Sequence, residues 1–187
     1  MCRFRETTFE LLGGVTKLDF DGIDLGDDGV VQLAVVLPLC AKLTQLDLMR
    51  TQLGGKGAAA LAGAIKGNGV VKRLFLQHNP IGDAGDAAFA DALRVNGVLE
   101  ILTLGNSKIG DAGAAALADA LRINGVLEAL VLTQNKIGDA GAAALADALR
   151  VNGALTWLSL RDNQIGEESK SKLRKAVQGR SGFHKGW

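Results

Sequence analysis

The sequence predicts an α/β solenoid, a right-handed stack of strand–helix units whose strands form one parallel sheet. Two observations predict this fold class. The first is the near identity of two adjacent segments, residues 99–125 and residues 127–153. The second is a fixed period of 28 residues between the leucines that lead each inner Leu-x-Leu: Leu18, Leu46, Leu74, Leu102, Leu130 and Leu158. A period of this length indicates identical supersecondary units that stack side by side.

The first half of each repeat predicts a short strand. In residues 127–153, Leu130 and Leu132 occupy alternate positions, which is the pattern of a strand with one buried face. Residues on either side of the leading leucine therefore point away from the core.

The second half of each repeat predicts a helix with one apolar stripe. In the same repeat the stripe consists of Gly141, Ala144, Leu145, Ala148 and Leu149. Asp139 is expected to cap the start of its own helix. Asn152 and Gly153 are expected to end the helix through the left-handed conformation. Asp83 and Asp111 repeat the capping pattern.

One such unit cannot bury its apolar residues alone, so the units are expected to stack in register. Strands lie about 4.8 Å apart, and helices are wider than this spacing. The sheet is therefore expected on the concave face of a curved arc, with the helices on the convex face.

The repeats resemble the leucine-rich repeats of the ribonuclease-inhibitor type. The matching pattern is LxxLxLxxN, here Leu127, Leu130, Leu132 and Asn135, followed by IGDxGAxALAxAL. The resemblance covers roughly residues 15–178 and implies a horseshoe arc. It also implies that the asparagine bonds backbone groups in the turn, a position that Asn79 and Asn163 also match.

Three segments follow from the repeat pattern. Residues 1–14 are expected to form a half-repeat cap at the N-terminal end. Residues 15–179 hold six repeats, and the last one is expected to cap the stack because its helix carries serine, lysine and arginine in place of alanine. Residues 180–187 are expected to be a flexible tail.

Composition narrows the classes of partner and the compartment. The net charge of +1 produces no overall field toward nucleic acid or membrane. No apolar run is long enough to span a membrane, and no signal peptide is visible. Two cysteines make no disulfide framework. We expect a cytoplasmic protein that binds neither nucleic acid nor membrane.

The search for catalytic chemistry predicts none. The chain has two histidines, His78 and His184, and two distant cysteines, which do not make a metal cluster. The segment from Gly54 to Gly57 suggests a phosphate loop, but it aligns with the turn that precedes each helix. We expect no catalytic residue, no metal and no cofactor.

The sheet surface predicts a binding site for a protein. Bulky apolar residues are expected to form a seam across adjacent strands, and aromatic and arginine side chains are common anchors of interfaces. The candidate partner-binding residues are Phe75, Ile101, Val131, Trp157, Arg161, Met49 and Gln77. A second apolar patch, Val31 and Val35 on the first helix, predicts a possible homodimer contact, as does an open end of the stack.

The sequence therefore predicts a non-catalytic protein–protein interaction module that binds a partner on its concave face. Two alternatives stay open. Activators of the Ran GTPase resemble this chain in repeat type, although they typically carry an acidic tail and this tail is basic. Leucine-rich sensor domains of larger nucleotide-binding receptors are the other alternative.

Overall fold

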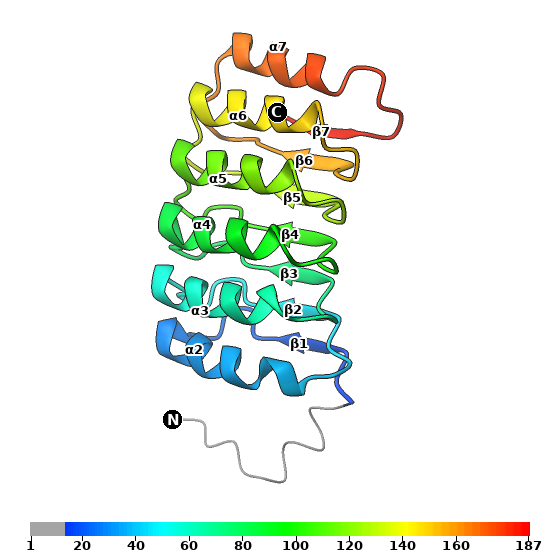
Figure 1. Cartoon of the computed structure of the whole chain (residues 1–187). Helices are drawn as coiled ribbons and strands as arrows, with labels where there is room; N and C mark the ends of the chain where they lie inside the picture. Colours follow the sequence, from blue (N-terminus) through cyan, green and yellow to red (C-terminus); the bar gives the residue numbers. More distant parts are fainter. Residues whose placement is uncertain (1–13) are drawn as a thin grey trace.

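The structure, a computed structural model, describes residues 14–187. Strands and helices alternate along the chain and stack as successive units (Figure 1). The expected half-repeat cap at residues 1–14 lies, except for Gly14, outside the described residues. Within the described chain the architecture is the predicted α/β solenoid.

The strands form one parallel sheet in chain order. The leading leucines pair with one another from Leu18 to Leu158, so the predicted alignment is confirmed. The strands are β1 (Lys17–Asp19), β2 (Gln45–Asp47), β3 (Arg73–Phe75), β4 (Ile101–Thr103), β5 (Ala129–Val131), β6 (Trp157–Ser159) and β7 (His184–Gly186).

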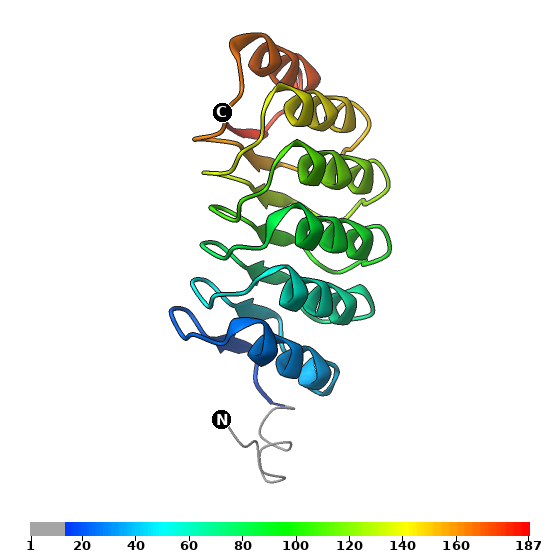
Figure 2. The same cartoon turned by 90° about the vertical axis from the view of Figure 1, so that its left-hand side faces the viewer.

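The helices form a second layer along one side of the sheet, and the stack bends only gently (Figure 2). A short 3₁₀ helix, η2 (Leu37–Leu39), follows the first of them. The α-helices are α2 (Gly26–Val36), α3 (Gly55–Lys66), α4 (Gly82–Leu93), α5 (Asp111–Leu121), α6 (Asp139–Leu149) and α7 (Glu167–Ala176). Residues Gly54 to Gly57 are the start of α3, as the sequence alignment predicts.

The core lies between the two layers and runs without a break from Val30 to Val177. Glycines let the helices approach one another closely. A Cβ atom at Gly85 on α4 would lie 2.9 Å from Ala58 Cβ on α3, and one at Gly141 on α6 would lie 2.7 Å from Asp111 Oδ1 on α5. Side chains at these positions would push the helices apart.

The predicted capping of each helix by its own aspartate is wrong, because the aspartate caps the next helix. Asp111 lies at the start of α5, yet its Oδ1 accepts hydrogen bonds from the backbone N–H of Gly138 at 2.7 Å and of Gly141 at 2.8 Å. Asp83 caps α5 in the same way, and Asp27 caps α3. Each carboxylate therefore joins two repeats.

The start of α4 shows what happens without such an aspartate. The preceding repeat carries Gly55 at this position, which has no side chain to offer. Gly82 then adopts a positive φ of 66° and donates its N–H to the Ser107 carbonyl at 2.9 Å. Gly110 and Gly138, which bond an aspartate, are extended instead.

The predicted left-handed ending at Asn152 and Gly153 is also wrong. Neither residue has a positive φ. Asn152 is buried, and its Nδ2 donates to the carbonyls of Leu121 at 2.7 Å and of Asn124 at 2.8 Å. Asn124 and Asn96 make the corresponding bonds to the repeats before them. These residues form a ladder of buried amides that links successive repeats.

The turn asparagines behave as the family resemblance implies. Asn79 Oδ1 accepts from the backbone N–H groups of Thr51 and Leu53, each at 3.0 Å. Its Nδ2 donates to the carbonyls of Leu48 and Leu76. Asn135 and Asn163 bond their neighbouring turns in the same way.

The expected flexible tail contains ordered structure, which corrects that prediction. His184–Gly186 forms β7 and pairs with β6. Arg180 occupies the next position of the amide ladder, 28 residues after Asn152, and donates to the carbonyls of Leu149, at 3.3 Å, and Leu155. Phe183 and Trp187 pack against the end of the core. Burial of two aromatic rings holds this segment in place.

Candidate protein-interaction surface

The surface of the sheet opposite the helices, here called the sheet face, carries three rows of side chains. The first residue of each strand makes one row, the third residue makes another, and a third row follows two residues later. The rows are Lys17, Gln45, Arg73, Ile101, Ala129, Trp157 and His184; Asp19, Asp47, Phe75, Thr103, Val131, Ser159 and Gly186; and Asp21, Met49, Gln77, Gly105, Thr133 and Arg161.

The sheet face is acidic at β1 and β2. Asp47 lies beside the carboxylates of the first repeat. Burial raises the pKa of Asp47, and so do the charges of Asp19 and Asp21, against a hydrogen bond from the Met49 N–H. Asp19 pairs with Lys17 at 3.0 Å, and Asp21 pairs with Arg50 at 2.5 Å. This end of the face therefore carries more acid than base.

The middle of the sheet face is apolar, and large and small residues alternate on it. Phe75, Ile101 and Val131 are half-buried, and each lies beside a small residue on the next strand. The small residues Thr103, Ala129 and Ser159 are buried. Since adjacent strands are close, a large side chain on one strand covers the small one beside it. The four predicted seam residues thus lie on four consecutive strands, β3 to β6.

Trp157 is the most exposed large residue of the seam, with 50% of its surface accessible. Its ring lies 5.9 Å from that of His184 on β7, at a tilt of 47°. Arg161, in the third row of the same repeat, is exposed. The β6–β7 end of the three rows is therefore aromatic and carries the cation Arg161, whereas the β1–β2 end carries mostly carboxylates.

Met49 and Gln77 lie in the third row and are half-buried. Among the described residues, Gln77 Oε1 has no hydrogen-bond partner, nor does Thr103 Oγ1 on the neighbouring strand. The predicted partner-binding residues thus all belong to one face. Val31 and Val35 lie elsewhere, on α2, where Val35 is 74% exposed.

Comparisons with known proteins agree with this geometry. The profile of a family described as "Leucine Rich repeat" matches residues 39–62, 95–118 and 124–146. The chain is a leucine-rich repeat protein. No match was found among curated protein sequences.

Two solved structures share the leucine-rich repeat fold of this chain. One is "Leiomodin-1 Actin-Binding Site 2 (ABS2)", with a TM-score of 0.60 and 15% identity over 95% of this chain and 89% of that one. The other is the tropomodulin C-terminal domain of Caenorhabditis elegans, with a TM-score of 0.59 and 12% identity over 92% and 90% of the two chains. Likeness at this level of identity shows the fold.

A rim of polar residues, not predicted from the sequence, runs along the sheet face. The residue after each third-row position adopts a left-handed backbone. After Asp21 it is Gly22, and after the other five positions it is Arg50, His78, Asn106, Gln134 or Asp162, with φ between 51° and 60°. All five are exposed, and Asn106 Nδ2 lies 3.0 Å from His78 Nδ1. Their recurrence every 28 residues is the signal that could have identified the rim.

The described residues of this leucine-rich repeat protein hold no group of three or more histidine, cysteine or acidic side chains placed to bind a metal. The aspartates at the helix starts bond backbone amides instead. Cys40 is buried, and this burial raises the pKa of its thiol. No helix in residues 14–187 combines the length and the apolar character needed to cross a membrane.

Proposed function

We propose that this chain is a non-catalytic interaction module whose sheet face binds a protein partner. The observation that carries the proposal is the half-exposed Trp157 at the end of an apolar seam on that face. Aromatic residues dominate the binding energy of many interfaces, and a contiguous exposed apolar surface is typical of a contact site.

The fold does not need a tryptophan at position 157. The corresponding positions of neighbouring strands carry Ala129, Ile101 and Arg73, and those strands pair in the same register. The indole therefore adds a large apolar surface beyond what strand pairing requires. Insertion of this ring into a partner would remove that surface from water, and this supports the choice of Trp157 as the central contact.

The charges of the sheet face favour one orientation of a bound partner. Acidic side chains gather at β1 and β2, whereas the cation Arg161 lies in the same repeat as Trp157 at the other end. A partner with a basic region facing Asp19 and Asp47 and an acidic region facing Arg161 would match both ends. Complementary charge of this kind speeds association and selects one register of binding.

Actin is a specific partner to test, because the leiomodin-1 structure bears the name of an actin-binding site. The support is the shared fold, and no contact residue is carried over at 15% identity. Co-sedimentation of this chain with filamentous actin, and a pull-down with monomeric actin, would test this partner directly. Absence of binding in both assays would remove actin and leave the proposed face open to other proteins.

Trp157→Ala tests the proposed face. We expect the variant to bind a captured partner about 30-fold more weakly, the scale of an interface hot spot near 2 kcal/mol. The partner is first captured from a source lysate and identified by mass spectrometry, and affinity is then measured by titration. The thermal melting curve of the variant should match that of the natural protein, because half of the Trp157 surface is exposed already.

Val151→Ala is the matched control. Val151 is 65% exposed and lies just after α6, away from the sheet face. The Val151→Ala substitution removes exposed apolar surface without touching the seam, so affinity should stay unchanged. Equal affinity of Trp157→Ala and the natural protein, or an equal loss in both variants, would reject the sheet face as the binding site.

A further inference from the structure

Within residues 14–187, β7 is the last strand of the sheet, and its outer edge is unpaired. The His184 N–H donates to the Thr156 carbonyl at 2.7 Å, and the Gly186 carbonyl accepts from the Leu160 N–H at 2.6 Å. Successive residues of a strand direct their backbone groups to opposite sides, so the N–H and C=O of Lys185 face away from β6. An edge of this kind can pair with another strand.

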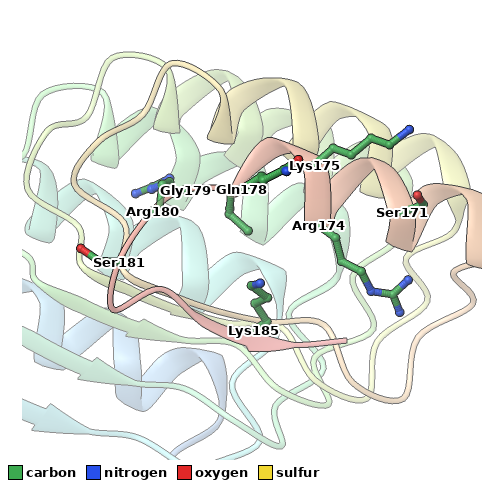
Figure 3. Close-up of a pocket in the computed structure, with 9 residues that line it drawn as sticks. Ser171, Arg174, Lys175, Gln178, Gly179, Arg180, Ser181 and Lys185 are labelled. Carbon is green, nitrogen blue, oxygen red and sulfur yellow. The ribbon is translucent and has the colours of Figure 1, made fainter.

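A basic cavity lies beside this edge, between α7 and β7, with a volume of about 530 Å³ (Figure 3). Its cationic residues are Arg174, Lys175, Arg180 and Lys185, and none of the lining residues is acidic. Figure 3 shows Lys185 extending from β7 toward α7, and Arg174 extending from α7. The cavity occupies the place that the core of a further repeat would fill.

Most of this positive charge lacks a counter-ion within the described chain. Lys175 and Lys185 have no carboxylate within ion-pair distance, and Arg174 lies 3.6 Å from the exposed Glu167. Arg180 stabilises the fold. Its guanidinium donates hydrogen bonds to the carbonyls of Leu149 and Leu155 and lies 4.8 Å from the centre of the Phe183 ring. Lys175 and Lys185 therefore remain without a counter-ion among the described residues, and Arg174 is only weakly paired.

We propose that this end of the solenoid binds an extended acidic segment of a protein partner, which pairs as an additional strand with the free edge of β7. Side chains of a strand alternate between its faces, so every second residue of the segment would point toward the cavity. Glutamate or aspartate at those positions meets Lys185 and Arg174, which favours charge-assisted hydrogen bonds. This surface is separate from the sheet face.

Lys185 makes the edge selective. An inward-pointing lysine on an edge strand blocks pairing with apolar strands, because their arrival would bury an uncompensated charge. A basic strand, such as β7 of a second copy, is repelled as well. An acidic strand neutralises the same charge. The residue that prevents unwanted pairing therefore selects the partner.

The probe for this site is an end-blocked, fluorescent peptide of alternating glutamate and threonine, measured by anisotropy. We expect saturable binding that weakens as salt is added, and a loss of at least about tenfold in affinity for Lys185→Glu. The matched control is Lys66→Glu, an exposed lysine at the end of α3, which should bind as the natural protein does. A peptide with lysine in place of glutamate should not bind.

Strand pairing is tested separately from charge. The same peptide with N-methyl groups on alternate amides keeps its charge but loses its ladder donors, and its affinity should fall. Hydrogen exchange of the Lys185 amide should slow when the unmodified peptide saturates the protein. Equal affinity of the methylated peptide, or unchanged exchange at Lys185, would overturn strand addition.

A second substitution distinguishes a loss of binding from a folding defect in Lys185→Glu. Lys185→Gln keeps the length and polarity of the side chain, and circular dichroism with thermal melting checks that both variants fold. Affinity should fall in Lys185→Gln as well, by a smaller factor. A folded variant at Lys185 that binds the acidic peptide as tightly as the natural protein would overturn the proposal.

Discussion

Asn124 is a buried side chain whose partners lie in two different repeats. Its Nδ2 donates to the carbonyls of Leu93 and Asn96, and its Oδ1 accepts from the N–H groups of Val126 and Leu127. Four backbone groups therefore depend on one amide. Unsatisfied buried groups cost about 1–3 kcal/mol each.

Asn124→Ala should consequently lower the free energy of unfolding by at least about 3 kcal/mol. Urea denaturation of the two proteins measures the difference. Asn68 offers a comparison within the same ladder. It accepts from the N–H groups of Val70 and Val71, and its Nδ2 makes no repeat-bridging donation to any residue that the structure describes. Asn68→Ala should cost less, and an equal cost for both substitutions would contradict the role of the bridging bonds.

Asp86 is a buried carboxyl without a hydrogen-bond partner among the described residues. It lies on α4, where α3, α5 and α6 carry Ala58, Ala114 and Ala142 at the equivalent position. Burial, with a smaller contribution from the Asp83 carboxylate, raises the pKa of Asp86 to about 8. An exposed aspartate in the unfolded chain titrates near 4.

The stability of the protein should therefore depend on pH through Asp86. Between pH 4 and pH 8 the folded state holds a proton that the unfolded state has released, so this group favours folding at low pH. That contribution falls as pH rises, by about 1.4 kcal/mol per pH unit. Asp86→Ala should remove this slope and be the more stable protein at pH 8.

Urea denaturation of the natural protein and of Asp86→Ala at pH 5 and pH 8 measures this effect. The exposed Asp91, on the same helix, provides the control substitution Asp91→Ala. The quantity to compare is the change in unfolding free energy between the two pH values. The same change in all three proteins would show that Asp86 does not govern the pH dependence.

Sequence reasoning succeeds for residues whose partners repeat with the pattern, and fails for those whose partner lies in another repeat. The buried leucines and the rows of the sheet face follow from alternation alone, because a strand has only two faces. The sequence does not indicate whether Asp111 and Asn152 bond groups in their own repeat or in a neighbouring one. Their short polar side chains suit a local cap and a bridge equally well.

Four α-helices, α3, α5, α6 and α7, are capped at their start by an aspartate of the repeat before them. Asp111 Oδ1 accepts two N–H groups at the start of α6, at 2.7 Å and 2.8 Å. The first N–H groups of a helix have no partner within it, and loss of a side-chain acceptor there typically costs about 0.5–2 kcal/mol. The cap also couples the order of one repeat to the next.

Asp111→Ala should thus destabilise the protein by about 1–2 kcal/mol, chiefly through α6. Asp119→Ala is the matched control on α5, because Asp119 is exposed and pairs only weakly, at 3.7 Å, with Arg122. Hydrogen exchange should locate the loss at the amides of Gly138 and Gly141. If those amides keep their protection, or if the two variants are equally destabilised, the bridging cap does not contribute measurably to the free energy of unfolding.

The sequence did not predict the strand β7, and its residues show the reason. Residues Phe183 to Trp187 have no leucine pattern, and the pairing of Trp157 with His184 breaks the period of 28 residues. The strand exists because β6 offers an open edge and two aromatic side chains pack on the core. Strand formation depends on such context more than on local preference.

The whole molecule is a linear stack in which each unit contacts its neighbours along the chain. The stability of such stacks is close to a sum of repeat and interface terms, and their ends are the weakest points. Phe183, Trp187 and Arg180 seal the C-terminal end of the core. Both the proposed strand-addition site and the Trp157 end of the sheet face depend on this seal.

Deletion of residues 180–187 should therefore weaken the C-terminal units while leaving the distant ones intact. The amides of β6 and α7 should exchange at least about tenfold faster, because their core side chains lose their cover and β6 becomes the edge. The amides of β2 and α3, four repeats away, should keep their protection. A uniform acceleration along the whole chain would instead mean that the stack unfolds as one cooperative unit. In that case the coupling carried by the bridging aspartates and asparagines would exceed the local cost of an open end.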